Sequence, residues 1–552
     1  MASILTLHTP KASIEYYRAG YWQKESFFLL LKKWAEQEPA AWFVRDARHR
    51  LNYADALAWT ESIAARLERT GLRAGDRVAI SMPNRVEAIL IFLACSRNGY
   101  LGIPSLHQNY TTREVVALLE RTRAKALFNQ TGYGVDGARN ERSEAAAAID
   151  GMKAVFRLGA GNDAGDAAPD GARPAGAPVD DADKVVYLAF TSGTTGMPKA
   201  VMHSDNTLLA NARTMLRDWG HDSNTVILAL SPLSHHNGWV ALGQMLTAGG
   251  EMVLNDPPSG MKALDWIVET GATYLMGVPT HAIDVLAEIR RRGLKAAGKV
   301  KTWYIAGAPI PPDVSAEIMS MGIKPQNVYG MTENSSHQYP LPTDDAETMT
   351  TTCGRANAGY EVRIFQPENN DVEVPVGSVG EIGGRGACLM LGYFDHQKAT
   401  EESFNADGWF MTGDLGVLDT RGNLKIVGRV KDVIIRGGHN IFPAHIENLA
   451  LQHKAILKAA AFPIADDRLG ERVCLALTFN PGQALSGEEV LAHLRDVNLS
   501  KYDMPEYMAV MEELPTTASG KILKRELVVM VDEGRLVPHA ISATVQTKVN
   551  KE

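Results

Sequence analysis

Apolar positions follow two alternating patterns along most of the chain. Short continuous apolar runs, such as residues 77–82 (RVAISM) and 185–190 (VVYLAF), lie between longer stretches with helical spacing, such as residues 52–71. Continuous apolar strands between amphipathic helices predict a parallel sheet that is covered by helices on both faces. Candidate N-terminal caps of the helices are Ser26, Asn52 and Ser204.

Two later regions depart from this alternation. Residues 160–183 contain no aromatic residue and are rich in Ala, Gly, Asp and Pro, which predicts a mobile surface loop. From about residue 360 the apolar runs are shorter and turn residues separate them, and the last part of the chain has the pattern of a small α+β domain. We therefore expect an α/β protein with a large N-terminal domain of doubly covered β-sheets and helices, residues 1–428, and a small mobile α+β C-terminal domain, residues 429–552.

Composition excludes several classes of protein. The 552 residues carry a net charge of −8, which argues against a nucleic-acid partner. The longest apolar run, residues 88–95, is far shorter than the roughly 20 residues of a membrane-spanning helix. The N-terminal apolar stretch is also too short for a signal peptide. The four cysteines show no C-x-x-C spacing, so we expect reduced thiols in a soluble cytoplasmic protein with no membrane partner.

The sequence TSGTTGMPK, residues 191–199, follows an apolar strand and precedes a helix. Glycines allow close backbone approach, and backbone N–H groups, hydroxyls and a lysine are the donors that hold phosphate. A Walker A loop does not fit, because Gly193 and Gly196 are too close together and Lys199 does not follow a glycine. A simple polar turn would explain one glycine and one serine, but not a biased run of this length.

This loop resembles the phosphate loop of the adenylate-forming superfamily, which includes acyl-CoA synthetases, luciferases and the adenylation domains of peptide synthetases. The other motifs of the family follow in order, so the resemblance covers nearly the whole chain. They are PLSHHNG at 232–238, AGAP at 306–309, NVYGMTE at 327–333, GWFMTGDL at 408–415, GRVKDVIIRGGHNIFPAHIE at 428–447 and PTTASGK at 515–521.

The resemblance implies a two-step reaction that uses ATP, Mg²⁺ and coenzyme A. A carboxylate attacks the α-phosphorus of ATP to give an acyl-adenylate and pyrophosphate, and the thiol of CoA then takes the acyl group and releases AMP. Because an anion attacks a polyanion, the site must supply positive charge and fixed donors. Lys521 matches the lysine that bridges the carboxylate and the α-phosphate. Thr332 matches a phosphate-side hydroxyl, and Glu333 matches a Mg²⁺ ligand.

Further positions match the nucleotide, acyl and CoA sites of the family. The ATP and AMP contacts fall on Thr191, Ser192, Gly193, Thr194, Thr195, Gly196, Lys199, Gly307, Ala308, Pro309, Asn327, Tyr329, Gly330, Asp414 and Arg429, of which Asp414 and Arg429 form the ribose pair. His235 matches the gating residue beside the acyl site, and His236 is expected to be structural. We expect the acyl pocket to be lined by His235, Trp239, Val278, Gly330 and Met331. Lys431 matches the hinge of a domain rotation that presents Gly437, Gly438 and His439 to CoA.

The acyl-site segment also narrows the substrate. No acidic residue lies between Leu228 and Gly250, so the ammonium group of an α-amino acid would be buried without a partner. The apolar flanks of this segment and the bulk of Trp239 favour a compact hydrophobic acid: alicyclic, aromatic, branched or medium-chain. In general appearance the chain is similar to bacterial cyclohexanecarboxylate- and medium-chain-type CoA ligases.

Several alternatives stay open at this point. No carrier domain follows Lys521, which favours CoA as acceptor, but a free-standing carrier protein could replace it. A non-catalytic adenylate-binding relative or a luciferase-like oxygenase would share the motifs. Lysine acylation at Lys521 would remove the charge that attracts phosphate. We expect a monomer or a homodimer.

Overall fold

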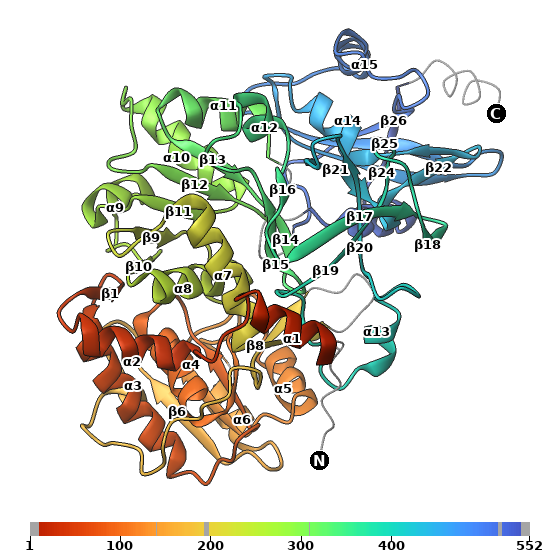
Figure 1. Cartoon of the computed structure of the whole chain (residues 1–552). Coiled ribbons are helices and arrows are strands. Elements are labelled where there is room, and N and C mark those ends of the chain that lie inside the picture. Colours follow the sequence, from red (N-terminus) through yellow and green to blue (C-terminus); the bar gives the residue numbers. More distant parts are fainter. Residues whose placement is uncertain (1–9, 140, 192–197, 309, 517–521, 542–552) are drawn as a thin grey trace. The chain divides into compact units, whose positions relative to one another are not determined.

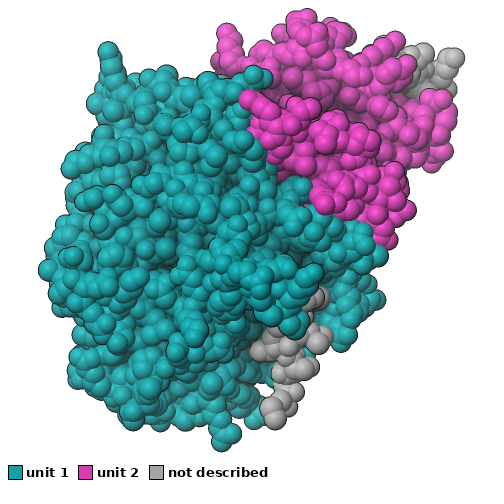
Figure 2. Space-filling model, in the orientation of Figure 1, with its two compact units in different colours: residues 1–362, 384–410 teal, residues 363–383, 411–552 magenta. Residues whose placement is uncertain are grey.

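The computed structural model describes residues 10–139, 141–191, 198–308, 310–516 and 522–541. Figure 1 labels its elements where there is room. The chain forms two compact units, residues 1–362 with 384–410 and residues 363–383 with 411–552 (Figure 2), and each unit is described by itself. The domain boundary near residue 428 and the rotation about it stay predictions.

The first unit contains a six-stranded sheet, and the predicted phosphate loop connects its last two strands along the chain. Its order is β6-β5-β3-β4-β7-β8, and all neighbours are parallel except β7 and β8, which are antiparallel. The strands are β3 (Arg77–Ser81), β4 (Leu101–Ile103), β5 (Ala126–Gln130), β6 (Ala154–Leu158), β7 (Val185–Thr191) and β8 (Lys199–Ser204). The helices of this part are α1 (Pro10–Arg18), α2 (Phe27–Gln37), α3 (Tyr53–Glu68), α4 (Val86–Asn98), α5 (Thr112–Arg121) and α6 (Arg142–Ala147).

A seven-stranded sheet follows in the same unit, with the order β13-β12-β11-β9-β10-β1-β2. Every neighbouring pair is parallel except β1 and β2. Its strands are β1 (Trp42–Arg45), β2 (Arg50–Asn52), β9 (Val226–Ala229), β10 (Glu251–Leu254), β11 (Tyr274–Gly277), β12 (Thr302–Ile305) and β13 (Lys324–Asn327). Its helices are α7 (Asp205–Trp219), α8 (His236–Ala248), α9 (Ala263–Thr270), α10 (Pro279–Arg291), α11 (Pro312–Ser320) and α12 (Ala346–Thr351).

Both sheets are covered on their two faces. Alternate residues of β9 belong to different hydrophobic cores, Ile227 to one that includes Trp239 and Leu228 to one that includes Trp266. Because side chains alternate across a strand, the two cores lie on opposite faces of the sheet. Every residue of α4 from Val86 to Arg97 is buried, as expected of a helix enclosed on all sides. The doubly covered α/β architecture predicted from the apolar pattern is confirmed.

The predicted helix starts are also confirmed. The side chains of Ser26, Asn52 and Ser204 each accept a hydrogen bond from the backbone N–H three residues later, and so satisfy one free donor of the first turn. Helix α3 ends at Glu68, within the stretch of helical spacing at residues 52–71, and Gly71 adopts a left-handed conformation beyond the helix. No helix among the described residues is long and apolar enough to cross a membrane.

Residues 160–183 run along α3 and contain one short helical turn, Gly165–Ala167. The Trp59 indole N–H donates to the Ala167 carbonyl oxygen at 2.7 Å, and the Gly171 N–H donates to Ser62 Oγ at 3.1 Å. These contacts fasten the segment to the helix at separate points. Its mobility stays a prediction.

The second unit has the α+β pattern expected of the tail. Its main sheet has the order β23-β22-β25-β26-β27, and β24 also pairs with β25, in the antiparallel direction. The strands are β22 (Ile434–Arg436), β23 (His439–Ile441), β24 (Ile456–Asp466), β25 (Gly470–Phe479), β26 (Tyr507–Val510) and β27 (His539–Ala540), and the helices are α14 (Pro443–Ala450), α15 (Gly487–Asp496) and α16 (Lys524–Asp532). Two hydrophobic cores, around Leu475 and around Phe462, cover the sheet.

Smaller sheets complete the chain. A three-stranded sheet has the order β14-β15-β16, and a five-stranded sheet has the order β18-β17-β19-β20-β21. The chain passes between the two units within β17, β19 and the start of β20. The elements are β14 (Tyr329–Met331), β15 (Ser335–Tyr339), β16 (Arg355–Ala356), β17 (Tyr360–Gln366), β18 (Asn369–Glu373), β19 (Gly380–Gly386), α13 (Gln397–Glu401), β20 (Phe410–Leu418) and β21 (Leu424–Arg429).

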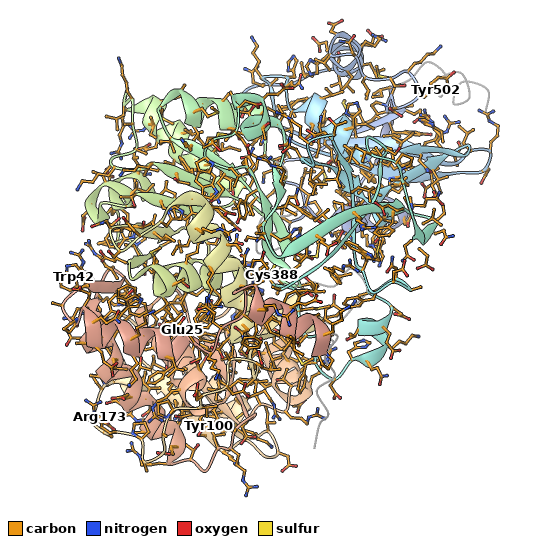
Figure 3. The ribbon with its side chains drawn as sticks, in the orientation of Figure 1. Glu25, Trp42, Tyr100, Arg173, Cys388 and Tyr502 are labelled. Atoms are coloured by element: carbon orange, nitrogen blue, oxygen red, sulfur yellow. The ribbon has the colours of Figure 1, made fainter. Side chains whose placement is uncertain are left out.

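The four cysteines, Cys95, Cys353, Cys388 and Cys474, are all free thiols, as the spacing predicted. Burial raises the pKa of each thiol, so they stay protonated and behave as small apolar side chains. Cys388 is labelled in Figure 3 and packs in a hydrophobic cluster with Trp22.

Candidate active site

The two ends of the predicted phosphate loop meet across a pair of strands. Thr191 ends β7 and pairs with Lys199, which begins β8. The hairpin therefore fixes both ends of the loop at the edge of the first sheet. Seven predicted site residues lie outside the described residues: Ser192, Gly193, Thr194, Thr195, Gly196, Pro309 and Lys521.

The loops after three parallel strands of the second sheet meet at one edge. Gly277 at the end of β11 is in register with Ile305, and Ile305 is in register with Asn327. The carboxyl edge of an open parallel sheet is where such folds bind ligands. This edge gathers the predicted residues Val278, Gly307, Ala308, Asn327 and Tyr329, and Gly307 has a positive φ of 91°.

The tight turn between β14 and β15 carries Thr332 and Glu333. A Cβ on Gly330 would lie 1.8 Å from the Ser335 carbonyl oxygen, so only glycine fits at this crossing. The Asn334 side chain closes the turn, because its Oδ1 accepts the Met331 N–H at 3.0 Å. The turn thus has a fixed backbone that presents a hydroxyl and a carboxylate side by side.

Three contacts hold this turn from outside. Thr332 O lies 2.6 Å from His203 Nε2, the Tyr393 hydroxyl donates to Glu333 Oε1 at 2.9 Å, and the backbone N–H of residue 390 donates to Glu333 O at 2.7 Å. Since a carbonyl only accepts, Nε2 of His203 carries the proton. Sequence reasoning missed both His203 and Tyr393. The position of His203 could have identified it, since it is a buried histidine on the strand that directly follows the phosphate loop.

Tyr329, the predicted adenine neighbour, is 8% exposed. Its ring packs edge-on against His337, with centroids 5.5 Å apart, and His337 stacks on Tyr360 at 4.1 Å. Asn327 is already engaged within the fold. Its Nδ2 donates to the Met349 carbonyl oxygen, and its Oδ1 accepts from Ser315.

Histidines cluster at the start of α8, where His235 is the N-cap residue. The ring of His107 lies 4.5 Å from that of His235, and its Nδ1 lies 3.0 Å from Ser234 Oγ. Burial lowers the pKa of His107 to about 3 and also lowers the pKa values of His235 and His281. These rings are therefore neutral at pH 7. His107 and His281 were missed because their proximity to His235 arises only in the fold.

The neighbouring His236 packs inside the unit. Its ring nitrogens lie 3.3 Å from the Tyr187 hydroxyl and 3.0 Å from Ser335 Oγ. Burial lowers its pKa to about 3. These are the contacts of a structural histidine that joins α8 to β7 and β15.

The predicted acyl-pocket residues fall into different clusters. The Trp239 indole is 1% exposed, lies 4.5 Å from the Phe92 ring and donates to the Leu233 carbonyl oxygen at 2.7 Å. Met331 instead packs in the cluster that contains Tyr393. A shared pocket wall for Trp239 and Met331 stays a prediction.

The predicted ribose pair lies in the second unit. Asp414 and Arg429 face each other on β20 and β21, and Arg429 Nε lies 3.0 Å from Asp414 Oδ1. Glu381 lies close by, and its Oε1 accepts the Gly413 N–H at 3.0 Å. Burial raises the pKa of Glu381, and the charge of Asp414 raises it further. The sequence motifs did not point to Glu381.

The predicted CoA segment forms the turn of the β22–β23 hairpin. Gly437 and Gly438 have φ values of 59° and 84°, a conformation that favours glycine. His439 Nε2 lies 3.0 Å from Asp503 Oδ1. Lys431, the predicted hinge residue, lies in a short helical turn, Val430–Asp432, and is exposed.

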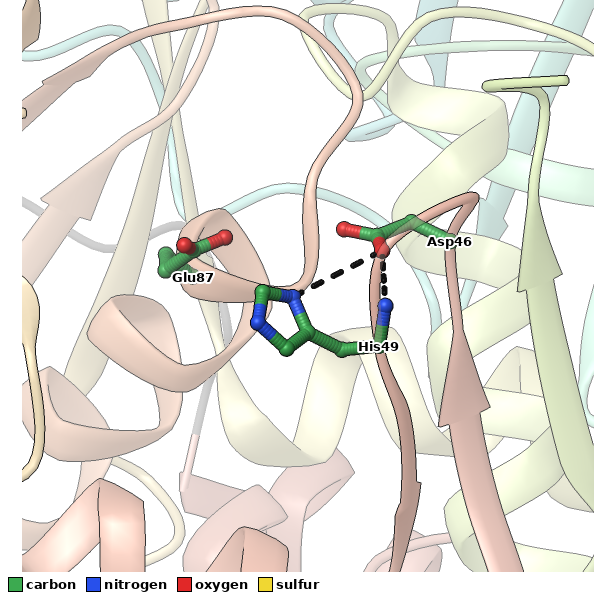
Figure 4. Close-up of side chains that lie close together, drawn as sticks. All are labelled: Asp46, His49 and Glu87. Carbon is green, nitrogen blue, oxygen red and sulfur yellow. Dashed lines mark hydrogen bonds and ion pairs between the residues drawn. The ribbon is translucent and has the colours of Figure 1, made fainter. Parts of the chain in front are cut away.

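A different group of possible metal ligands lies in the first unit. Asp46, His49 and Glu87 approach one another, as Figure 4 shows. Arg85 already pairs with both carboxylate oxygens of Glu87, and Asp46 accepts three backbone N–H bonds, from residues 48, 49 and 86. These carboxylates are satisfied within the fold, so the group is a buried polar network.

Comparison with known proteins agrees with this geometry. Residues 31–394 match the family model described as AMP-binding enzyme, and residues 445–521 match that of the AMP-binding enzyme C-terminal domain. A medium-chain fatty-acid–CoA ligase of Escherichia coli (strain K12) is 31% identical over 82% of this chain and 81% of its own length. A salicylyl-CoA synthase / salicylate adenylyltransferase of a Streptomyces species is 31% identical over 94% of this chain and 96% of its own.

The structure is similar as well. ATP-bound MatB from Rhodopseudomonas palustris superposes with a TM-score of 0.82 at 28% identity, covering 92% of this chain and 99% of that one. The expected adenylate-forming fold is thereby confirmed. The chain belongs to the family of AMP-binding enzymes.

Proposed function

We propose that this chain joins a compact hydrophobic carboxylic acid to coenzyme A at the expense of ATP. The acid and ATP give an acyl-adenylate and pyrophosphate, and the acyl-adenylate and CoA then give an acyl-CoA and AMP. This is the AMP-forming acid–CoA ligase reaction, which agrees with the family and with the names of the relatives. The observation that carries the proposal is the fixed turn that presents Thr332 and Glu333 next to the strand of Lys199.

The donor set of this turn fits Mg²⁺. Glu333 is 8% exposed and one of its oxygens accepts a hydrogen bond, which fixes the carboxylate. Mg²⁺ prefers one or two carboxylates together with phosphate oxygens. Bound there, the cation would neutralise phosphate charge, while the Thr332 hydroxyl and the Lys199 ammonium would donate to phosphate oxygens.

Residues of several sequence motifs would hold the nucleotide. Thr191–Lys199 would wrap the phosphates, and Gly307, Ala308 and Tyr329 would border the adenine. Asp414 would accept from the ribose hydroxyls. Its existing ion pair with Arg429 supports this role, because the pair holds the carboxylate in one orientation. Lys521 would bring positive charge to the attacking carboxylate and the α-phosphate.

The acyl site favours an uncharged, apolar acyl group. The segment between Leu228 and Gly250 contains no Asp, Glu, Lys or Arg. The neighbouring His107, His235 and His281 are neutral, so neither an ammonium nor a second carboxylate would find a charged partner there. The names of the relatives, for a medium-chain fatty acid and for salicylate, agree with an apolar monocarboxylic acid.

The second step would use the β22–β23 turn. Gly437, Gly438 and His439 would face the pantetheine after a rotation near Lys431, which allows pyrophosphate to leave before the thiol enters. A carrier protein could take the place of CoA.

AMP release with CoA, measured for acids of graded size and shape, tests the proposal. Rapid release with medium-chain or aromatic monocarboxylic acids supports it. If AMP release requires a carrier protein, the acceptor is that protein and not CoA. Absence of AMP release with every acid and either acceptor would overturn it.

A further inference from the structure

A buried tyrosine links two of the proposed active-site groups. The Tyr393 hydroxyl donates to Glu333 Oε1 at 2.9 Å, and the Lys199 ammonium lies 4.5 Å from the centroid of the same ring. Tyr393 is only 6% exposed. The family motifs quoted from the sequence do not include it.

The backbone around Tyr393 is fixed to both partners. Residues 390–394 run beside β8, where the Phe394 N–H donates to the Ala200 carbonyl oxygen at 2.8 Å and the Met202 N–H donates to the Gly392 carbonyl oxygen at 3.0 Å. At its other end this segment donates the Met390 N–H to the carbonyl oxygen of Glu333 at 2.7 Å. The segment therefore bridges the strand that leaves the phosphate loop and the turn of Thr332 and Glu333.

The chemistry of the phenol suits both contacts. A phenol is protonated at neutral pH, so the hydroxyl donates and the Glu333 carboxylate accepts. A hydrogen bond to an ionised carboxylate is about twice as strong as one between neutral groups. The face of the ring attracts the Lys199 ammonium at the observed distance.

We infer that Tyr393 is a positioning residue, which orients the Glu333 carboxylate for the divalent cation through its hydroxyl and places the Lys199 ammonium for the phosphates through its ring. One side chain would thus set both charged groups of the phosphate site. The inference rests on the proposed function, because it takes Glu333 to be the cation ligand.

Binding of Mn²⁺ to the full chain with ATP and no acid, followed by the electron paramagnetic resonance of free Mn²⁺, tests this inference without turnover. Tyr393→Phe removes the hydroxyl and keeps the ring. We expect it to weaken Mn²⁺ binding about ten-fold, the loss typical of a hydrogen bond to a charged group, and to leave ATP binding without metal unchanged. Tyr393→Leu removes the ring as well and should also weaken ATP binding without metal.

Tyr339→Phe is the matched control. It removes another buried hydroxyl that donates to a carboxylate, Asp218 Oδ2 at 3.0 Å, on the C-terminal turn of α7. It should leave Mn²⁺ binding unchanged. If Tyr339→Phe weakens Mn²⁺ binding as much as Tyr393→Phe does, the effect is a general loss of packing and the inference is wrong.

Glu333→Gln separates the inference from the proposed function. If this variant binds Mn²⁺ as tightly as the wild type, the role proposed for Glu333 fails. If it weakens binding and Tyr393→Phe does not, the positioning role of Tyr393 fails while the proposed function stands. In a Glu333→Gln background, Tyr393→Phe should have no further effect, whereas a purely structural tyrosine would weaken binding in both backgrounds.

Discussion

The Nε2 nitrogen of His203 lies 2.6 Å from the carbonyl oxygen of Thr332, although 129 residues separate them. The His203 Nδ1 lies 3.0 Å from Thr207 Oγ1 at the start of α7, so the ring is held from both sides. The strand that leaves the phosphate loop is thereby joined to the turn that carries Thr332 and Glu333.

Removal of His203 should impair the first half-reaction. His203→Ala leaves the half-buried Thr332 carbonyl without this donor, which costs at most about 1–3 kcal/mol and loosens the turn. We expect a lower kcat/KM for ATP in acid-dependent ATP–pyrophosphate exchange. His203→Gln, whose amide can donate to the same carbonyl, should restore part of it.

His221→Ala provides the control. His221 is a half-buried histidine, and it stacks at 4.3 Å on Tyr274 at the start of β11, away from the carboxyl edge. This variant should lose stability and keep the KM for ATP. A His203→Ala enzyme with wild-type kcat/KM would show that the turn does not depend on this contact.

Lys521 should be needed for one half-reaction only. Lys521→Ala should slow adenylation by a factor on the order of 10²–10³, the usual effect of removing one well-aimed donor. Thioester formation from preformed acyl-AMP should be largely kept, since the CoA thiol is the nucleophile of that step and no attacking carboxylate has to be brought to the α-phosphate. Acylation of Lys521 should have the same effect, because it neutralises the amine. Equal loss of both half-reactions would contradict this division.

Gly330 should tolerate no side chain. A Cβ would lie 1.8 Å from the Ser335 carbonyl oxygen, and backbone at such a crossing cannot move aside easily. Overpacking typically costs about 1–3 kcal/mol, and we expect Gly330→Ala to lie at the upper end and to lower the urea midpoint. Gly176→Ala is the control, because its Cβ would meet only the Glu68 side chain at 3.2 Å. An unchanged midpoint for Gly330→Ala would show that the turn is adaptable.

His337 should make stability depend on pH. It is fully buried, neither ring nitrogen has a hydrogen-bond partner among the residues that the structure describes, and burial lowers its pKa to about 3. The unfolded chain, with a histidine pKa near 6.5, therefore binds a proton that the folded chain excludes. Its contribution to stability is complete above pH 6.5 and is lost as the pH falls toward 3, by about 1.4 kcal/mol per pH unit.

His337→Phe should reduce this loss. The phenyl ring can keep the stacking on Tyr360 and takes up no proton. Urea midpoints of the wild type and the variant, compared between pH 7 and pH 5, measure the difference. An identical pH dependence for the two proteins would show that His337 is hydrated or charged in the fold.

Features that depend on residues close together in the sequence, or on a family motif, could be predicted from the sequence. Ser26, Asn52 and Ser204 were identified as caps because a cap and its partner are three residues apart. The link from Tyr393 to Glu333 could not be predicted, because it depends on how a late segment packs beside β8. The neutrality of His107 follows from burial, which the sequence does not reveal.

The measurement that tests the central claim most directly is ATP–pyrophosphate exchange across a panel of carboxylic acids in the absence of CoA. We predict exchange that requires Mg²⁺ and an apolar monocarboxylic acid, and that Lys521→Ala slows by a factor on the order of 10²–10³. Exchange with none of the acids, despite measurable ATP binding, would identify a nucleotide-binding protein without adenylating activity and would contradict the account.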